Sequence, residues 1–137
     1  MSPTQSKLSR RTVIVIIALI VAAAASLRII GLREAPAGGH GDVAWIGINA
    51  LDWIDRGAFP YYVYELYAPE PMIVQLTALA IPFTGVAHLA SRWVTVIFGL
   101  LLVILLYPAT SWLLADWPAK RRQRAALVAA AAAGLSL

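Results

Sequence analysis

The feature that most constrains this chain is the stretch from Trp93 to Leu114, which contains no charged residue. A helix of about 20 apolar residues crosses the ~30 Å hydrocarbon core of a bilayer, and this stretch is long enough to do so. Residues 12–30 form a second apolar stretch, and its one charge, Arg28, lies near the end, where a long side chain can reach the headgroups. The two stretches predict an all-α integral membrane protein with transmembrane helices over 12–30 and 92–114.

The composition agrees with this prediction. Apolar residues make up 61% of the chain and charged residues 13%, and the mean hydropathy is +0.76. Ordinary globular chains are roughly 45–50% apolar and cover their cores with more polar residues. The chain contains no cysteine, which excludes disulfides, thiolate catalysis and cysteine-ligated zinc.

The basic residues predict the orientation. Of the 11 Lys and Arg residues, seven fall in two clusters beside the apolar stretches, one in the tail 1–11 and one in the segment 115–124. Cytoplasmic segments next to transmembrane helices carry an excess of Lys and Arg, so both clusters are expected inside and residues 31–91 outside. We therefore expect a multi-pass protein of the plasma (inner) membrane with a cytoplasmic N-terminus and an extracytoplasmic loop. Since no basic face interleaves with base-stacking aromatic residues, we expect no nucleic-acid partner.

Two shorter helices are predicted in the external segment. The first covers Val43–Arg56, with Asp42 as its N-cap and Gly57 as its C-terminal stop. Asn49, Asp52 and the last residue of this helix follow the +3/+4 spacing of one polar stripe. A short, mostly apolar helix with such a stripe is typical of a helix that lies in the membrane interface.

The second short helix covers residues 71–85, with Pro71 in its first turn and Pro82 able to kink it. Tyrosines crowd the stretch before it, as in the aromatic belts of membrane proteins. Residues 125–137 begin a third transmembrane helix and stop before it can cross, so we expect the sequence to end within a helix.

A cleaved signal peptide is the alternative for the first apolar stretch. Arg10 and Arg11, followed by an apolar region and the alanine run 22–25, suit a twin-arginine or ordinary leader. A leader does not explain the apolar segments that follow, so we favour a transmembrane helix. A transporter lacks support, because no ionisable residue lies in the middle of a predicted span.

Residues that offer chemistry lie in the external segment. His40 and Asp42 are separated by one residue and can share a ligand or a metal ion, although such a pair is a weak pattern. The chain contains no Walker phosphate-binding loop, no G-x-S-x-G nucleophile elbow and no H-E-x-x-H zinc helix. The residues alone therefore do not define a reaction.

After the basic tail and the first span, the chain reads GDVAWIGINALDWIDRGAFP, then YAPEPMIVQLTALAIPFTG, then ASRWVTVIFGLLLVILLY. This order resembles the start of membrane glycosyltransferases with the C-type (GT-C) fold, over about residues 12–137. It looks most like the branch that includes protein O-mannosyltransferases and the bacterial transferases that add aminoarabinose or other sugars to lipid A. The resemblance implies that the helices over 43–56 and 71–85 are the two juxtamembrane helices of that fold.

The resemblance also implies roles for individual residues. Asp42 corresponds to the catalytic Asp of the first external loop, and Arg92 to the arginine that opens the second span. A part in substrate binding is implied for Arg92 together with Glu70, His40 and Tyr67. Many members of the family have Glu after the catalytic Asp, where this chain has Val43. Any role of that Glu is therefore lost here or taken by another residue such as Glu70.

Partners follow from the same resemblance. The donor is expected to be a polyprenyl-phosphate-linked sugar, the acceptor a lipid, glycan or protein, and the surroundings membrane lipids. Transfer with inversion needs a base on the acceptor side and stabilisation of the leaving phosphate. The cofactor is unknown, with a divalent metal ion as a candidate.

The alternative interpretation is a small non-catalytic membrane scaffold or assembly subunit, or an inactive remnant of such an enzyme. A reading frame that continues past Leu137 favours the transferase, and a stop codon there favours the alternative. This portion of the enzyme is expected to be inactive alone.

Overall fold

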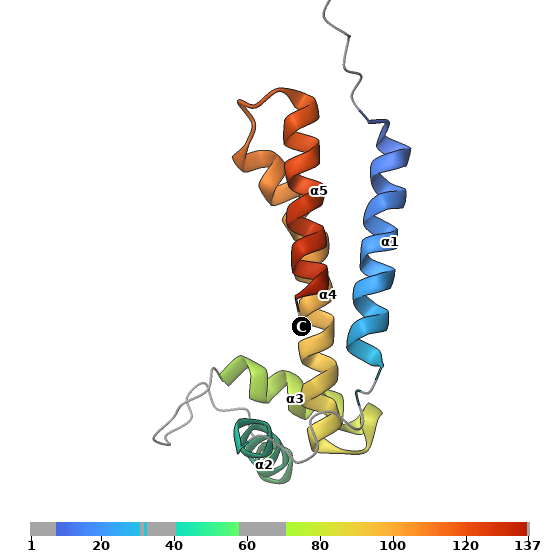
Figure 1. Ribbon diagram of the computed structural model, residues 1–137. Helices are drawn as coiled ribbons and strands as arrows, with labels where there is room; N and C mark the ends of the chain where they lie inside the picture. The colour runs from blue at the N-terminus through green and yellow to red at the C-terminus, as the bar shows by residue number, and fades with distance from the viewer. Residues whose placement is uncertain (1–7, 31, 33–40, 58–70, 137) are drawn as a thin grey trace, which may run out of the picture. The chain divides into compact units, whose positions relative to one another are not determined.

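The computed structural model describes residues 8–30, 32, 41–57 and 71–136. Within these ranges the chain forms five α-helices and no strand (Figure 1), which confirms the all-α prediction for these residues. The helices are α1 Arg10–Ile29, α2 Gly41–Arg56, α3 Pro71–Thr84, α4 Ala87–Leu113 and α5 Ala119–Leu135. They belong to two compact units, which we call unit 1 (residues 1–30 and 98–137) and unit 2 (residues 31–97). α4 begins in unit 2 and ends in unit 1.

Two of the described helices, α1 and α4, are long and apolar enough to cross a membrane by length and composition. At ~1.5 Å per residue, the 20 residues of α1 extend about 30 Å and the 27 residues of α4 about 40 Å. α1 starts after Ser9, whose Oγ accepts a hydrogen bond from the backbone N–H of Thr12 (3.1 Å) and so caps the helix.

α4 begins at Ala87, ahead of the predicted start at 92. The preceding helix ends at Thr84, and the next residue, Gly85, has a φ of 72° and donates its N–H to the carbonyl oxygen of Ile81 (2.8 Å). This left-handed glycine is a common helix C-cap, because glycine adopts positive φ without steric cost. The chain can therefore start a new helix almost at once, and the last residues of the predicted external loop form the first turns of α4.

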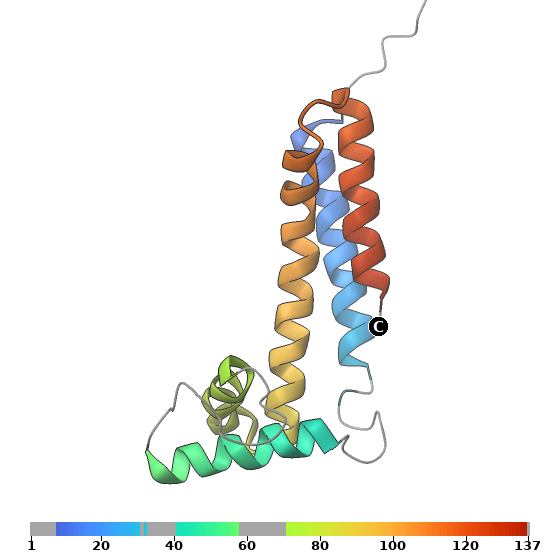
Figure 2. The same ribbon diagram turned by 90° about the vertical axis from the view of Figure 1, so that its left-hand side faces the viewer.

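In unit 1, α1 and α5 lie side by side and run in the same direction (Figures 1 and 2). The backbone N–H of Leu8 donates to Oε1 of Gln123 (3.0 Å), and Nε2 of Gln123 donates to the carbonyl oxygen of Leu8 (3.4 Å). At the other end, the Arg28 guanidinium donates to the carbonyl oxygens of residues 133, 134 and 136 (3.0, 2.7 and 2.8 Å). The two helices are thus joined at both ends, across 105 to 115 residues of sequence.

Small residues bring α1 and α5 close together. Ala126, Ala130 and Gly134 recur at every fourth position of α5 and are buried, so they share one face of the helix. A Cβ on Gly134 would lie 3.2 Å from Cγ2 of Ile20 and 3.5 Å from Cβ of Ala24. Such close approach at small residues is typical of helix pairs that pack within membranes.

The start of α5 differs from the predicted loop over 115–124 and from the predicted helix start at 125. α5 begins at Ala119, so the basic run 120–124 forms its first turns. Lys, Arg and Gln are good helix formers, and Pro118 stands just before the helix, where its missing N–H costs no helical hydrogen bond. Within the run, the one uncharged residue, Gln123, is also the buried one.

In unit 2, α2 and α3 pack against each other around four buried residues, at most 4% exposed: Ala50, Trp53, Val74 and Ala78. Partly buried apolar residues of both helices surround this core: Trp45, Ile46, Ile73 and Ile81. α2 ends at Arg56, and the next residue, Gly57, has a φ of 62° and donates its N–H to the carbonyl oxygen of Ile54 (3.1 Å). The predicted stop at Gly57 is therefore confirmed.

Candidate functional site

The predicted site lies at α2, which is held by two contacts within unit 2. One is the core shared with α3, in which Trp53 contributes the largest side chain. The other is Gly47, where a Cβ would lie 3.3 Å from Cβ of Ala87. The glycine lets α2 pass close to the first residue of α4. The first turn of α2, where the candidate catalytic residue lies, therefore belongs to a packed helix.

Asp42 lies in the first turn of α2, because the helix begins at Gly41. The prediction of Asp42 as the N-cap is therefore wrong, since the helix already includes the residue before it. An acidic residue in the first turn is still favoured by the positive end of the helix dipole. The structure describes the backbone of Asp42 and not its side chain. His40, Tyr67 and Glu70 lie outside the described residues, so their roles stay predictions.

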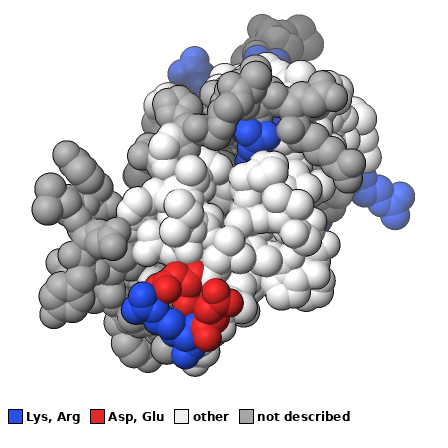
Figure 3. All heavy atoms as spheres, turned by 90° about the horizontal axis from the view of Figure 1, so that it is seen from below, with Lys and Arg blue, Asp and Glu red and all other residues white. Residues whose placement is uncertain are grey.

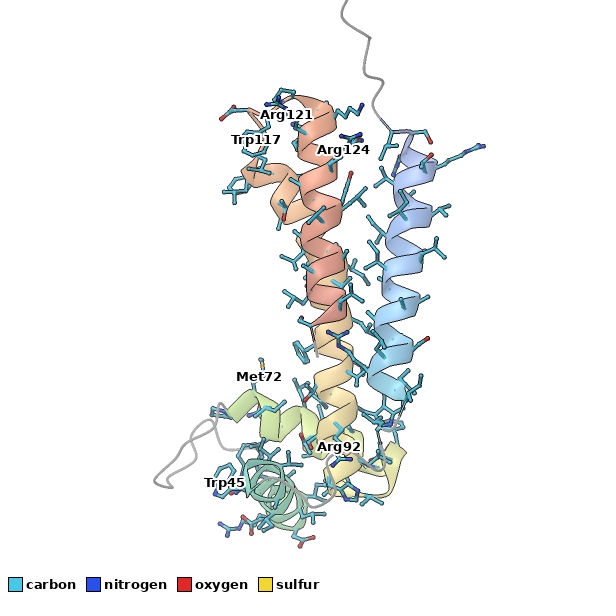
Figure 4. The ribbon with its side chains drawn as sticks, in the orientation of Figure 1. Trp45, Met72, Arg92, Trp117, Arg121 and Arg124 are labelled. Atoms are coloured by element: carbon cyan, nitrogen blue, oxygen red, sulfur yellow. The ribbon has the colours of Figure 1, made fainter. Side chains whose placement is uncertain are left out.

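Arg92 lies within the first turns of α4 (Figure 4), because the helix begins at Ala87 and not at the predicted position 92. Its Nη1 donates to the carbonyl oxygen of Leu32 (2.6 Å), a contact that joins residues 60 positions apart. The side chain is half-buried, and hydrogen bonds to charged groups contribute about 1.5–3 kcal/mol. Arg92 thus fixes the chain ahead of α2 to α4. Its part in substrate binding stays a prediction.

The polar stripe predicted on α2 is present. Nε of Arg56 donates to Oδ1 of Asp52 (2.8 Å), and Nδ2 of Asn49 donates to the carbonyl oxygen of Trp45 (3.0 Å). The ion pair is exposed, with 72% and 41% of the two side chains accessible. In Figure 3, acidic and basic side chains lie together in one small area of the face that is seen. Exposed pairs of this kind contribute only about 0.3–0.5 kcal/mol to stability. The stripe is therefore an exposed surface of α2 that adds little to the stability of the helix.

Apolar side chains accompany this stripe on α2. Ile48, Leu51 and Ile54 are 66%, 45% and 40% exposed. α2 therefore buries one side against α3 and presents both apolar and charged side chains elsewhere. This mixture is what a helix lying in a membrane interface carries.

The described residues contain no group of three or more His, Asp or Glu side chains that could hold a metal ion. The described acidic side chains of unit 2 are Asp52 and Asp55, both on the exposed side of α2. The side chains of Asp42, His40 and Glu70 are not among those described. Metal binding by these three residues therefore stays open.

The sequence did not predict the partners of Arg28. Its guanidinium donates to the last carbonyl oxygens of α5 and to that of Ala24 in its own helix (3.4 Å). The last carbonyls of a helix lack intrahelical partners and carry partial negative charge, so a cation binds there. A Cβ on Gly99 would lie 3.1 Å from Nε of Arg28, so this glycine leaves room for the side chain.

Comparisons with protein-family models, curated proteins and solved structures find no match to this chain. Its function is therefore inferred from the helices and residues described above.

Proposed function

We propose that this chain is the N-terminal part of a membrane glycosyltransferase with the C-type fold. The enzyme transfers a sugar, with inversion, from a polyprenyl-phosphate donor to a lipid, glycan or protein acceptor on the extracytoplasmic side. The proposal is carried by one observation: a packed pair of short helices, α2 and α3, stands in the chain between two long apolar helices, with Asp42 in the first turn of α2. This is the order of segments on which the resemblance rests.

The direction of α1 and α5 supports the proposed orientation. The hydrogen bonds between Leu8 and Gln123 place the starts of these helices at the same end of unit 1. If α1 and α4 are the crossings that precede α5, its basic start lies on the same side as the basic tail, as the excess of cations in cytoplasmic segments favours. A crossing by α3 would put the two starts on opposite sides. With 14 residues, α3 extends only about 21 Å, less than the ~30 Å of the hydrocarbon core.

In the proposed reaction, Asp42 accepts the proton of the acceptor hydroxyl as the hydroxyl attacks the anomeric carbon. The dipole of α2 favours the ionised carboxylate but also makes it a weaker base, so orientation of the acceptor contributes much of the rate. The leaving phosphate needs a cation or other donors. Arg28 and Arg56 have structural partners in the chain. We propose that Arg92, for which a part in substrate binding is predicted, Arg33, a metal ion or groups from the rest of the enzyme bind this phosphate.

The test compares Asp42→Asn with Asp55→Asn in the natural full-length enzyme. Asp55 lies on the same helix, is exposed and serves as a matched control. Membranes with each variant are supplied with polyprenyl-phosphate-linked mannose or aminoarabinose, and labelled acceptor is measured. A general base contributes about 10²–10⁴-fold, so Asp42→Asn should lose nearly all transfer while Asp55→Asn retains it.

Two results contradict the proposal. Wild-type turnover by Asp42→Asn would show that the carboxylate is not the catalytic base. If the wild-type protein transfers sugar from none of these donors, the transferase proposal is wrong and the scaffold interpretation is favoured.

A further inference from the structure

The starts of α1 and α5 bring two basic clusters to one end of unit 1. Arg10 and Arg11 are the first residues of α1, and the run 120–124 lies in the first turns of α5. The reciprocal hydrogen bonds between Leu8 and Gln123 hold these two starts together. We call this set of six cations the basic end of unit 1; its members are Arg10, Arg11, Lys120, Arg121, Arg122 and Arg124.

Most of these cations have no ion-pair partner among the residues that the structure describes. Arg122 donates to the carbonyl oxygen of Ala115 (2.9 Å) and so closes the turn between α4 and α5. None of the other five cations forms an ion pair with an acidic side chain in the part of the chain that the structure describes. Unit 1 contains one acidic residue, Asp116, against the six cations. Figure 4 shows Arg121 and Arg124 at the start of α5.

Exposed apolar side chains lie beside the basic end. Trp112 and Leu113 in the last turn of α4 are 81% and 76% exposed, and Trp117 in the following turn is 51% exposed. Tryptophan is enriched at the headgroup level of membranes, because its ring is apolar and its N–H is polar. Cations and tryptophans together at one end of apolar helices match the chemistry of a lipid headgroup layer.

We infer that the basic end of unit 1 binds the phosphate groups of anionic phospholipids. Charge complementarity identifies this partner: the surface has an excess of cations, and arginine binds phosphate oxygens through two parallel hydrogen bonds. The apolar faces of α1 and α4 continue directly from it, which favours a lipid with a charged head and an apolar tail over a soluble anion. This inference rests on the membrane location in the proposed function and not on the transferase activity.

The geometry sets the expected behaviour. A basic residue near an anionic membrane surface typically contributes roughly a fivefold change in binding. Removing two cations from either helix start should therefore lower the preference for anionic lipid by about tenfold or more. Since one surface is formed by two helix starts, a change on α1 and a change on α5 should have the same direction of effect. Higher ionic strength should weaken the preference in the wild-type protein.

The experiment counts the lipids that stay bound. The purified full chain is reconstituted in bilayers of equal parts phosphatidylglycerol and phosphatidylcholine and released into mild detergent. Native mass spectrometry then gives the ratio of the two lipids retained. The variants are Arg121→Gln with Arg124→Gln on α5 and Arg10→Gln with Arg11→Gln on α1. Arg56→Gln removes a cation from unit 2 and is the matched control.

The wild-type protein and Arg56→Gln should retain phosphatidylglycerol over phosphatidylcholine, and both double variants should lose that preference. Equal retention of both lipids by the wild-type protein overturns the inference, as does an unchanged ratio in the double variants. Should the α5 variant fail to fold by circular dichroism, the α1 variant decides. An alkaline carbonate wash of the membranes separates the two proposals. Release of the protein by the wash would contradict the membrane insertion on which both proposals rest. A protein that resists the wash but shows no lipid preference would contradict only the lipid site.

Discussion

Arg28 of α1 and Gly134 of α5 meet where α5 ends, with Nη1 of Arg28 donating to the Gly134 carbonyl oxygen at 2.7 Å. Gly134 has two functions in this contact. Its missing side chain lets the helices approach, since a Cβ would lie 3.2 Å from Ile20. Its carbonyl is one of those that the end of a helix leaves without an intrahelical partner. One cation and one glycine thus hold the C-terminal ends of α1 and α5 together.

Replacing Arg28 by Ala should destabilise unit 1. The variant leaves the terminal carbonyls of α5 without the guanidinium, and hydrogen bonds to charged groups are worth about 1.5–3 kcal/mol. The stability of Arg28→Lys should lie between that of the wild type and that of Arg28→Ala. An ammonium group keeps the positive charge but lacks the planar set of donors that a guanidinium offers. Thermal unfolding in detergent, followed by circular dichroism, measures the difference. Arg56→Ala is the control, and an equal effect of the two alanine variants would show that Arg28 contributes no more than a surface pair.

Replacing Gly134 by Val should separate α1 from α5. Added methyl groups meet Ile20 and Ala24, and overpacking of a closed interface typically costs about 1–3 kcal/mol. Ala132→Val adds bulk to an exposed position of the same helix and should change stability by only a few tenths of a kcal/mol. Unfolding temperatures of the two variants provide the measurement. Similar values for both would argue against close packing at Gly134.

Replacing Trp53 by Ala should loosen the α2–α3 pair. Trp53 is 4% exposed in the core of unit 2, and truncation of a buried aromatic residue typically costs about 3–5 kcal/mol. Ile48→Ala removes an apolar side chain that is 66% exposed on the same helix and should have little effect. Limited proteolysis of the two variants measures the loss of protection. Equal cleavage rates would mean that the α2–α3 core does not stabilise unit 2.

Single cysteines test the proposed orientation, because the natural chain contains none. Ala119→Cys lies at the start of α5 and Asp55→Cys on the exposed side of α2. In intact cells, a membrane-impermeant thiol reagent should label position 55 and reach position 119 only after permeabilisation. Labelling of position 119 in intact cells would place the basic end of unit 1 outside and contradict the single external segment.

Local patterns in the sequence predicted the helices well. The apolar stretches correspond to α1 and α4, and Gly57 and Pro71 mark the end of α2 and the start of α3 as expected. These features could be predicted because helix formation and termination depend on residues within a few turns. The boundaries at Ala87 and Ala119 differ from the predicted ones. Residues 87–91 and the basic run 120–124 are assigned to loops by the charge pattern, although their Ala, Leu, Lys and Arg residues favour a helix.

The partners of α1 could not be predicted in this way. Arg28 contacts residues more than a hundred positions away, and no local pattern identifies which helix end a cation will meet. Gln123 among four cations and Gly134 at a four-residue spacing from Ala130 are signals that become clear only once α5 lies beside α1. For the candidate site, Asp42 is placed on α2 by its backbone. Its proposed chemistry still depends on the resemblance and on the test of Asp42→Asn.

The pairing of α1 with α5 also affects the time course of synthesis. At about 5–20 residues per second, the 105 to 115 residues between the contacting positions take roughly 5 to 25 s to make. During that interval the ribosome has finished α1, and Ala24 has no α5 beside it. Until α5 is made, this face of α1 lacks the partner that buries it in the folded protein. Assembly of unit 1 is therefore a late event, and substitutions on the small-residue face of α5 should extend the lifetime of the earlier, unpaired state.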